Sequence, residues 1–434
     1  MGILPNSLIK NNGDGTFTDV TISSGIYAAF PTQSAVWLDI NTDGWLDLFV
    51  GNETHNRQDI HPCQLWLNQK DGSFTDVAPK LGLNFQIYVK GVATGDINND
   101  GLPDLYISSI NGPNKLLANR GGTNPDDWVF EDITEKAGVA EPLESFPAWF
   151  FDYNNDGWDD LFVSSFDKFS LNQQSREVAA DYLGITSNSD WPRLYRNEGG
   201  EQFSDQTQST SLRRILPTMG CNFGDLDNDG FLDFYLGTGA PDYRAIVPNR
   251  MFRNNAGQSF QDVTSAGNFG HIQKGHGIAF ADLDNDGDKD IYAVMGGSLS
   301  GDIFPNALFE NPGNENKWLI LRLEGTHSNR SAIGAKIRID LQEENGSKRQ
   351  VFVTVNSGGS FGANSLQQEI GLGEAVKISN IAINWPDGKP TYTDYGEAVS
   401  NKAYRIKEGE NQLEIIECKP FKFIKDLHST GHHH

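Results

Sequence analysis

One nine-residue pattern, D-x-[DN]-x-D-G-x-x-D, occurs five times in the first 290 residues of this 434-residue chain. The copies run from Asp39 to Asp47, Asp96 to Asp104, Asp152 to Asp160, Asp225 to Asp233 and Asp282 to Asp290. A Phe-x-Asp segment comes before each copy, and its Phe lies 22 positions ahead of the first Asp every time: Phe17, Phe74, Phe130, Phe203 and Phe260. A constant internal spacing of this kind indicates one structural unit repeated along the chain.

The unit is predicted to be a four-stranded sheet. Short apolar runs typical of β-strands alternate with turn residues around each pattern, for example Leu105-Tyr106-Ile107 and Phe234-Tyr235-Leu236. The interval between successive patterns is 57, 56, 73 and 57 residues. A unit of this size with four strands is typical of a β-propeller blade. The longer interval places an insertion of about 16 residues between Leu161 and Arg193.

The phase of the repeat suggests how the ring would close. Residues 7–11 and 16–20 resemble the third and fourth strands of a unit, and residues 325–420 contain six further strand-like runs. We therefore predict an all-β, seven-bladed β-propeller, with repeats in residues 1–324 and with 325–420 completing the ring by pairing of N- and C-terminal strands. A six-bladed ring with a small separate β domain is the alternative. Residues 429–434 look like an expression tag.

The repeated pattern supplies oxygen ligands from one tight loop. Oxygens at positions 1, 3, 5 and 9 with a main-chain carbonyl at position 7 suit Ca²⁺, and Gly at position 6 permits the sharp turn. An EF-hand is excluded because its position 12 requires Glu, where the first loop has Val50. About five Ca²⁺ are predicted. Their side-chain ligands would be Asp39, Asn41, Asp43, Asp47, Asp96, Asn98, Asp100, Asp104, Asp152, Asn154, Asp156, Asp160, Asp225, Asp227, Asp229, Asp233, Asp282, Asp284, Asp286 and Asp290.

The acidity of the chain belongs in part to these loops. The formal charge is -24, and the predicted ligand positions of the loops hold 17 of the 58 Asp and Glu residues, so five Ca²⁺ would reduce the charge to -14. Such a charge argues against nucleic acid as a partner, and the lack of an apolar stretch of 18 residues argues against membrane insertion. Cys63, Cys221 and Cys418 are too few and too far apart for a disulfide framework.

These loops and Phe-x-Asp strands resemble the FG-GAP/VCBS repeats found in integrin α-subunit propellers. The C-terminal part resembles the ASPIC/UnbV module through Ser331 to Ile337, Asn356 to Phe361, Gly371-Leu372-Gly373 and Asn384 to Gly388. The resemblance implies a calcium-binding propeller in an extracellular or periplasmic setting, although no signal peptide is visible and a cytoplasmic location is the alternative. It implies no particular reaction.

The inner strand of each unit is expected to line the central channel. The residues six positions before each first Asp would then face the channel near one mouth: Gln33, Lys90, Phe146, Met219 and His276. Lys90 and His276, with Glu144 nearby in sequence, are candidate acid–base residues. They could equally do no more than line a water-filled channel, because no nucleophile motif or phosphate loop accompanies them.

Two further segments could form a lid or a partner-binding edge. One is the insertion, which holds Phe166, Phe169, Tyr182 and Trp191, and the other is Asp242-Tyr243-Arg244. Either could instead pack against a neighbouring blade. The sequence thus favours a binding module for a protein or glycan ligand. The alternative is a lyase, isomerase or cyclase that acts on a small-molecule substrate at the channel mouth.

Overall fold

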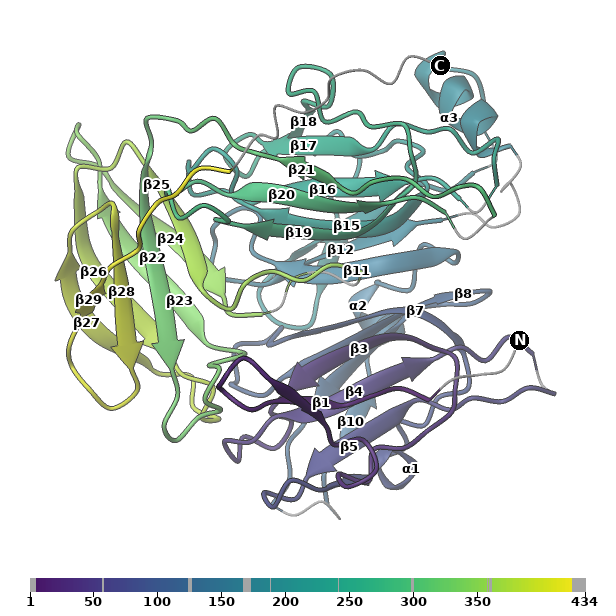
Figure 1. Cartoon of the computed structure of the whole chain (residues 1–434), viewed down its shortest axis with the longest axis horizontal. Coiled ribbons are helices and arrows are strands. Elements are labelled where there is room, and N and C mark those ends of the chain that lie inside the picture. Colours follow the sequence, from purple (N-terminus) through teal and green to yellow (C-terminus); the bar gives the residue numbers. More distant parts are fainter. Residues whose placement is uncertain are drawn as a thin grey trace.

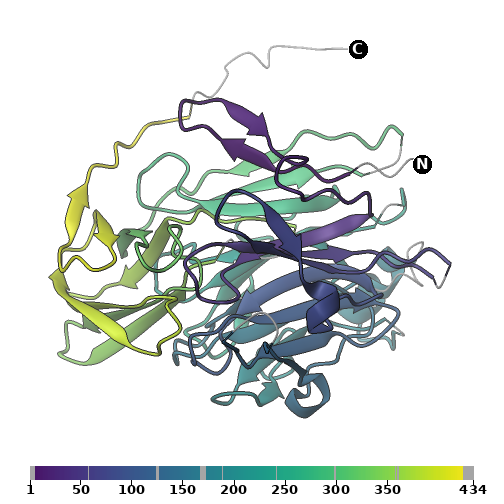
Figure 2. The same cartoon turned by 90° about the horizontal axis from the view of Figure 1, so that it is seen from below.

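The computed structural model describes residues 5–56, 58–123, 127–166, 173–187, 189–240, 242–297, 300–356, 358 and 361–423. Phe169 and the tag-like residues 429–434 lie outside them. In Figure 1 a fan of small antiparallel sheets occupies the right and centre, and a second pair of sheets stands at the left. Figure 2 shows the same division from below.

Five sheets of the fan each correspond to one repeat unit and are called blades 1 to 5. Blade 1 contains β3 (Thr32–Leu38), β4 (Asp47–Asn52), β5 (Gln64–Asn68) and β6 (Phe74–Asp76). Blade 2 contains β7 (Tyr88–Gly95), β8 (Asp104–Ile110), β9 (Lys115–Asn119) and β10 (Phe130–Asp132). Blade 3 contains β11 (Ser145–Phe151), β12 (Asp160–Ser165), β13 (Arg193–Asn197) and β14 (Phe203–Asp205). Blade 4 contains β15 (Thr218–Gly224), β16 (Asp233–Thr238), β17 (Arg250–Asn254) and β18 (Phe260–Asp262). Blade 5 has β19 (Gly275–Ala281), β20 (Asp290–Met295) and β21 (Ala307–Phe309).

The strand boundaries confirm the predicted layout of the repeat. Each inner strand ends at the residue before the first Asp of a loop, and each second strand begins at the ninth position. The Phe-x-Asp segments form the fourth strands of blades 1 to 4. Gly at position 6 has φ between 86° and 98° in all five loops, a conformation that side chains other than glycine rarely adopt.

Apolar cores lie between adjacent blades. One core joins blades 1 and 2 through residues such as Phe49 and Ile107, and another joins blades 3 and 4 around Trp149 and Phe234. Inner strands β3, β7, β11, β15 and β19 contact one another in this order. Because successive strand residues point to opposite faces, each sheet contributes one face to each neighbouring core.

In blades 2 to 5 an asparagine at or just after the end of the third strand bonds to the preceding blade. The side-chain amide of Asn119 donates to the carbonyl of Ile40 (3.0 Å), the second residue of the preceding loop. Asn197, Asn254 and Asn311 make the same bond to the loops of blades 2, 3 and 4, at 2.8 Å each. Asn68 of blade 1 donates to Leu46 of its own loop, at 3.0 Å.

Strands β1 (Ile9–Asn11) and β2 (Phe17–Asp19) form a half blade beside blade 1. They pair with each other in a two-stranded sheet, and Leu8 packs against the blade 1 core at Val50 and Trp66. The predicted pairing of this half blade with C-terminal strands is therefore wrong, because the described C-terminal strands pair among themselves. The seven-blade count is not confirmed.

The C-terminal strands build a separate module, here residues 317–416. One sheet has the order β25 (Gln368–Gly373), β22 (Lys317–Glu324), β28 (Lys402–Lys407) and β29 (Glu414–Ile416). The other has the order β24 (Lys348–Thr354), β23 (Lys336–Gln342), β26 (Lys377–Asn384) and β27 (Tyr392–Ala398). The two sheets share one apolar core that includes Leu321, Ile339 and Ile383. These residues therefore have their own core and do not extend the fan.

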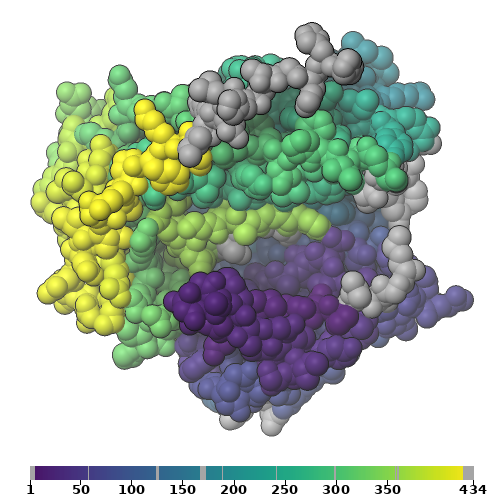
Figure 3. Space-filling model, viewed as in Figure 1, coloured from purple at the N-terminus to yellow at the C-terminus, as the bar shows by residue number. Residues whose placement is uncertain are grey.

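One segment of this module enters the fan. Residues 355–367, here called the plug segment, follow β24, and their described part is 355–356, 358 and 361–367. The Phe361 carbonyl accepts a hydrogen bond from the amide of Ile278 (3.0 Å), and Asn364 bonds to Phe280 and Phe223 of two inner strands. Figure 3 shows this yellow-green segment lying between the purple first blade and the green fifth blade.

Helices are few within the described ranges. Four-residue helices α1 (Ala78–Leu81) and α2 (Thr134–Ala137) follow β6 and β10, and α3 (Gln174–Tyr182) lies in the predicted insertion between β12 and β13. None of these helices is long or apolar enough to cross a membrane.

The asparagine bridge predicts a graded response to its removal. We expect Asn254→Ala to lower the free energy of unfolding by about 1–3 kcal/mol, because it leaves the carbonyls of Tyr153 and Leu232 without this donor in a buried position. Asn68→Ala is the matched control, since its amide makes no bond to another blade, and it should cost less. Urea unfolding of both variants measures the difference, and equal losses would contradict an inter-blade role.

Candidate functional site

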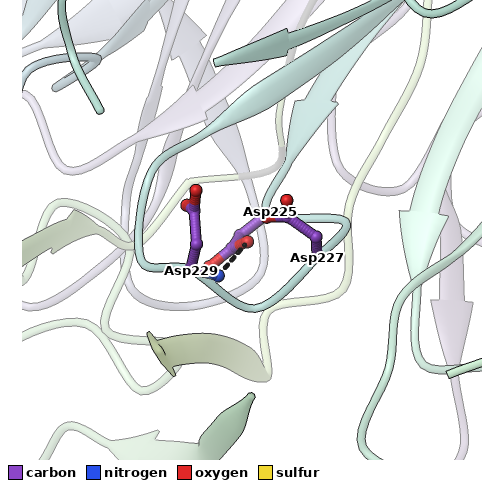
Figure 4. Close-up of side chains that lie close together, drawn as sticks. All are labelled: Asp225, Asp227 and Asp229. Atoms are coloured by element: carbon purple, nitrogen blue, oxygen red, sulfur yellow. Dashed lines mark hydrogen bonds between the residues drawn. The ribbon is translucent and has the colours of Figure 1, made fainter. Parts of the chain in front are cut away.

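The loop of blade 4 shows how the repeated pattern folds. The carboxylate of Asp225 accepts hydrogen bonds from the amides of Asp229 (3.1 Å) and Gly230 (2.8 Å), which wraps the loop around its first side chain. Asp227 and Asp229 lie over the same loop, as Figure 4 shows. One oxygen from each of these three carboxylates lies within 4.8 Å of the others. Asp282, Asp284 and Asp286 of blade 5 form a second such group.

The ninth residue of each loop joins the loop to the rest of its blade. One carboxylate oxygen of Asp233 accepts from the amide of Leu226 (2.8 Å), and the other accepts from the amide of Asn254 in the third strand (2.7 Å). The equivalent bonds occur in the other four loops at 2.8–3.2 Å. Every carboxylate oxygen has a second lone pair, so these bonds leave capacity for a cation.

Burial of several acids in each loop makes their charged forms costly. Burial raises the pKa of Asp225 to about 8, and repulsion from Asp229 and Asp227 adds to the shift. Burial likewise raises the pKa of Asp152 to about 8 and that of Asp47 to about 7. A divalent cation among these oxygens would remove the repulsion and favour the ionised carboxylates.

Unpaired buried oxygens at the third loop position fit a metal ligand. Within the described residues, Oδ1 of Asp227 and Oδ1 of Asn41 are buried and accept no hydrogen bond. Both belong to the third position, which the sequence predicted to coordinate. Hard oxygen donors without a nitrogen or sulfur ligand suit Ca²⁺. The loops therefore hold oxygen donors of the kind that Ca²⁺ prefers.

The C-terminal module rests on these loops. The amino group of Lys336 donates to the carbonyl of Asp96 (2.8 Å) and lies 3.3 Å from the carboxylate of Asp159 in the next loop. Burial alone would lower the pKa of Lys336, but Asp159 and Asp96 raise it above its usual value. Arg349 donates to the carbonyl of Asp229 at 3.2 Å. The module thus covers the end of the fan that carries the loops, as Figure 1 also shows.

The predicted channel residues lie at the opposite end of the inner strands. Every inner strand has a register shift at this position, which places Gln33, Lys90, Phe146, Met219 and His276 at or beside a β-bulge. A bulge re-aims the side chain that it carries. Phe146 and Met219 share one apolar cluster. The ring of Phe361 in the plug segment packs against that of Phe146, with ring centroids 5.2 Å apart and the planes tilted by 35°.

Lys90 is the centre of a polar cluster at this mouth. Its amino group forms an ion pair with Glu53, donates to Gln33 at 3.1 Å, and lies 4.3 Å from the ring centre of Tyr88. His55 lies 3.4 Å from Glu53 and packs on Tyr88. Burial raises the pKa of Tyr88 to about 12, with Glu53 and Glu144 contributing.

His276 belongs to a different part of the mouth. It lies on β19, whereas Lys90 lies on β7, and two other inner strands separate them. Burial lowers the pKa of His276, as does the charge of Lys274. Lys274 forms a buried ion pair with Asp302 at 2.9 Å. The structure therefore places the predicted acid–base residues Lys90 and His276 in separate clusters, with Glu144 near Tyr88.

The two predicted edge segments contact each other. The hydroxyl of Ser175 in α3 donates to the carbonyl of Arg244 at 2.7 Å. The side chain of Arg214 lies 5.4 Å from the ring centre of Tyr182. The insertion and the Asp242-Tyr243-Arg244 segment thus form one surface on blades 3 and 4.

Several residues at these sites were not predicted from the sequence. Glu53, the partner of Lys90, directly follows β4, and Asp302, the partner of Lys274, lies in a connection that shows no repeat. The bridging asparagines were visible as a repeated third-strand ending, but their role was not. The plug segment coincides with the Asn356 to Phe361 motif, of which Ser357, Gly359 and Ser360 lie outside the described residues.

Comparison with known families accounts for most of the chain. A family model described as an FG-GAP-like repeat matches residues 39–107, 96–163, 179–236 and 237–293. A second family model, described as ASPIC and UnbV, matches residues 325–413. The first match covers all five loops.

Curated relatives share the greater part of the chain. Cartilage acidic protein 1 of Xenopus tropicalis is 24% identical over 386 residues, which cover 86% of this chain and 54% of that protein. Cartilage acidic protein 1 of Homo sapiens is 23% identical over 402 residues, which cover 89% and 55%. The chain thus spans about half the length of these relatives.

Among solved structures, a lectin of Agrocybe aegerita, studied for recognition of non-reducing terminal N-acetylglucosamine, aligns with a TM-score of 0.37 at 15% identity, over 70% of this chain and 74% of that one.

The contact between Lys336 and Asp159 predicts strong coupling between the C-terminal module and the loops. We expect Lys336→Met to lower the free energy of unfolding by about 3–5 kcal/mol, because it leaves the buried carboxylate of Asp159 without its cation. The double variant Lys336→Met/Asp159→Asn should recover much of this loss. Lys348→Met, at an exposed position of β24, is the control. Urea unfolding measures all three, and equal effects of the two lysine variants would contradict the coupling.

Proposed function

Because the chain belongs to the family of FG-GAP repeat proteins, we propose that it is a calcium-stabilised β-propeller that serves as an extracellular module for binding a protein or glycan. The observation that carries this proposal is the contrast between the two ends of the fan. One end holds the loops and is covered by the C-terminal module. The other end presents variable connections with exposed large apolar side chains.

The uncovered end has the character of an interaction surface. Its connections expose large apolar side chains from blades 1 to 5: Ile60, Leu143, Tyr182, Leu183, Ile185, Tyr243, Ile246, Ile272, Ile303 and Phe304. Ile303 is 89% exposed and Leu183 is 73% exposed. Apolar side chains gathered on one face are typical of protein-binding surfaces, and Tyr and Arg side chains often supply the binding energy. Tyr182, Tyr243 and Arg244 lie on this face.

Calcium has a structural part in this proposal. The five loops lie between inner and second strands. Each contains at least one buried Asp whose pKa is raised by burial and by repulsion from neighbouring carboxylates. Ca²⁺ bound there would hold every blade in shape and present a fixed base to the C-terminal module. The uncovered connections would then be displayed on a rigid frame.

The calcium part predicts a large effect of chelation. We expect EDTA to lower the Tm markedly, because an ion that binds only the folded state contributes about 2.7 kcal/mol per site at a hundredfold excess over its Kd. Asp225→Asn should reduce bound calcium by about one ion per chain, whereas Glu344→Gln at an exposed position should not. Scanning calorimetry and elemental analysis measure these effects. An unchanged Tm after chelation would contradict the proposal.

The binding part predicts a dependence on the uncovered end. Arrays of secreted proteins and of glycans, probed with the calcium-loaded protein, are expected to yield a ligand. The double variant Leu183→Ser/Ile185→Ser should lower the affinity for that ligand at least tenfold because it removes apolar contact area from this face. Val399→Ser/Ile415→Ser is the control, since these residues are similarly exposed on the C-terminal module. A ligand that is lost equally in both variants would contradict the assignment to this end.

The ion pair of Lys90 and Glu53 favours one second candidate, an enzyme that performs acid–base chemistry at the channel mouth. Lys90 is nearly buried between the rings of Tyr88 and Phe146, where a charged amine is positioned without much water. Turnover of a small molecule that Lys90→Met abolishes, with the fold intact by circular dichroism, would support this candidate over the binding module.

A further inference from the structure

The half blade formed by β1 and β2 has the features of third and fourth strands. Asn11 ends β1 as Asn68, Asn119, Asn197, Asn254 and Asn311 end the third strands or follow them. Its side-chain oxygen accepts from the amide of Gly13 (2.8 Å), as that of Asn197 accepts from Gly199 (3.1 Å). The inner and second strands that accompany these elements in blades 1 to 4 have no counterpart here among the described strands.

The inner flank of blade 1 is correspondingly exposed. Inner strands β11 and β15 are buried along their whole length, whereas six of the seven residues of β3 are partly or fully exposed. A cavity of about 290 Å³ lies between β3, residues 92–94 of β7 and the plug segment, so β3 also borders open space on this side. A missing neighbour beside β3 accounts for the exposure of the strand.

The asparagine bridge is incomplete at the same place. Asn119, Asn197, Asn254 and Asn311 each donate to the second carbonyl of the preceding loop, but the loop that would precede Asn68 is absent from the described part of the chain. In each complete blade the main-chain amide of this asparagine also donates to the carboxylate of the ninth loop residue, as that of Asn68 does to Asp47 (2.8 Å). Asn11 has no such carboxylate among the described residues.

Blade 5 lies on the other side of the gap beside β3, here called the opening, and its surface there is also exposed. Ile291, Ala293 and Met295 of β20 face the core shared with blade 4. The alternate residues Tyr292 and Val294, which point to the other face of the strand, are 40% and 39% exposed. Side chains on both sides are therefore partly exposed, and Figure 3 shows the plug segment between the purple and green parts of this face.

We propose that this opening is a docking site for an inner β-hairpin of the repeat's own type, two strands joined by a D-x-[DN]-x-D-G-x-x-D loop. The second strand of the hairpin pairs with the free edge of β1, and its first strand packs beside β3. The carboxylate of its ninth loop residue accepts a hydrogen bond from the main-chain amide of Asn11. The carbonyl of its second loop residue accepts a hydrogen bond from the side-chain amide of Asn68. The blade then has four strands and a further metal loop.

The free edge of β1 is defined by hydrogen bonding on its other side. The amide of Leu8 donates to the hydroxyl of Thr21 (2.7 Å), and its carbonyl accepts from the amide of Val20 (2.9 Å), so both groups point toward β2. Because direction alternates along a strand, the amides of Ile9 and Asn11 point away from β2. Unpaired edge groups of this kind accept an added strand.

The test uses a labelled synthetic peptide with the sequence of residues 32–52, which is the inner hairpin of blade 1. In millimolar calcium we expect saturable one-to-one binding to the full chain by fluorescence anisotropy, a rise in Tm, and slowed hydrogen exchange at Ile9 and Asn11. Ile9→Pro, which removes one edge donor, should weaken binding at least tenfold, whereas Ile9→Val should not. Asn68→Ala should also weaken it, and this variant leaves the half blade intact.

Four results would overturn the proposal. They are failure of the peptide to bind, equal binding to Ile9→Pro and Ile9→Val, equal binding of a peptide with Asp39→Ala and Asp43→Ala, and self-association of the chain through this face that the peptide does not reverse. The test involves no residue of the uncovered end, so its outcome is separate from that of the proposed binding function.

Discussion

The ninth carboxylate of each loop is the contact on which the blades depend. In blade 4 the side chain of Asp233 begins the second strand, accepts the amide of Leu226 at the loop entrance, and accepts the amide of Asn254 in the third strand. Three segments of the blade are thus held by one buried carboxyl group. Burial and the neighbouring Asp225 raise its pKa well above the usual value, so the ionised form needs a compensating cation. A loop-bound divalent cation would supply it, and under the proposed function the order of the whole blade would then depend on the metal site.

The same loops also set the relation between blades. Side chains of Asn99, Asn155 and Asn228, at the fourth loop position, donate to the glycine carbonyl of the next loop at 2.7–3.3 Å. Third-strand asparagines bond back to the preceding loop, and Lys336 of the C-terminal module lies between two loops. Disorder in one loop would therefore reach both neighbouring blades and the C-terminal module. The five loops share one end of the fan because each joins the inner strand of its blade to the second strand.

The repeat allowed much of the fold to be predicted from the sequence, because the Asp pattern and the Phe-x-Asp strands have a fixed register within each blade. The strand ends, the sharp turns at glycine and the insertion that contains α3 all follow from that spacing. The arrangement of residues 317–416 could not be predicted in this way. Its sheets have no repeat, and β22 pairs in parallel with β28 some 80 residues later. The partners of the channel residues were missed for the same reason, because Glu53 and Asp302 lie in connections of irregular length.

The division of the fan into a repeated end and a variable end bears on where a ligand can bind. Contacts at the loop end are nearly identical from blade to blade and are covered by the C-terminal module, so this end offers little surface for recognition. At the other end the connections differ in every blade: a short turn with Asn111, a helix with Tyr182, a segment with Tyr243, and a segment with Ile303. The plug segment limits access along the channel, with Phe361 against Phe146. A large ligand would therefore meet the variable connections themselves, whereas a small one would reach only the polar cluster around Lys90.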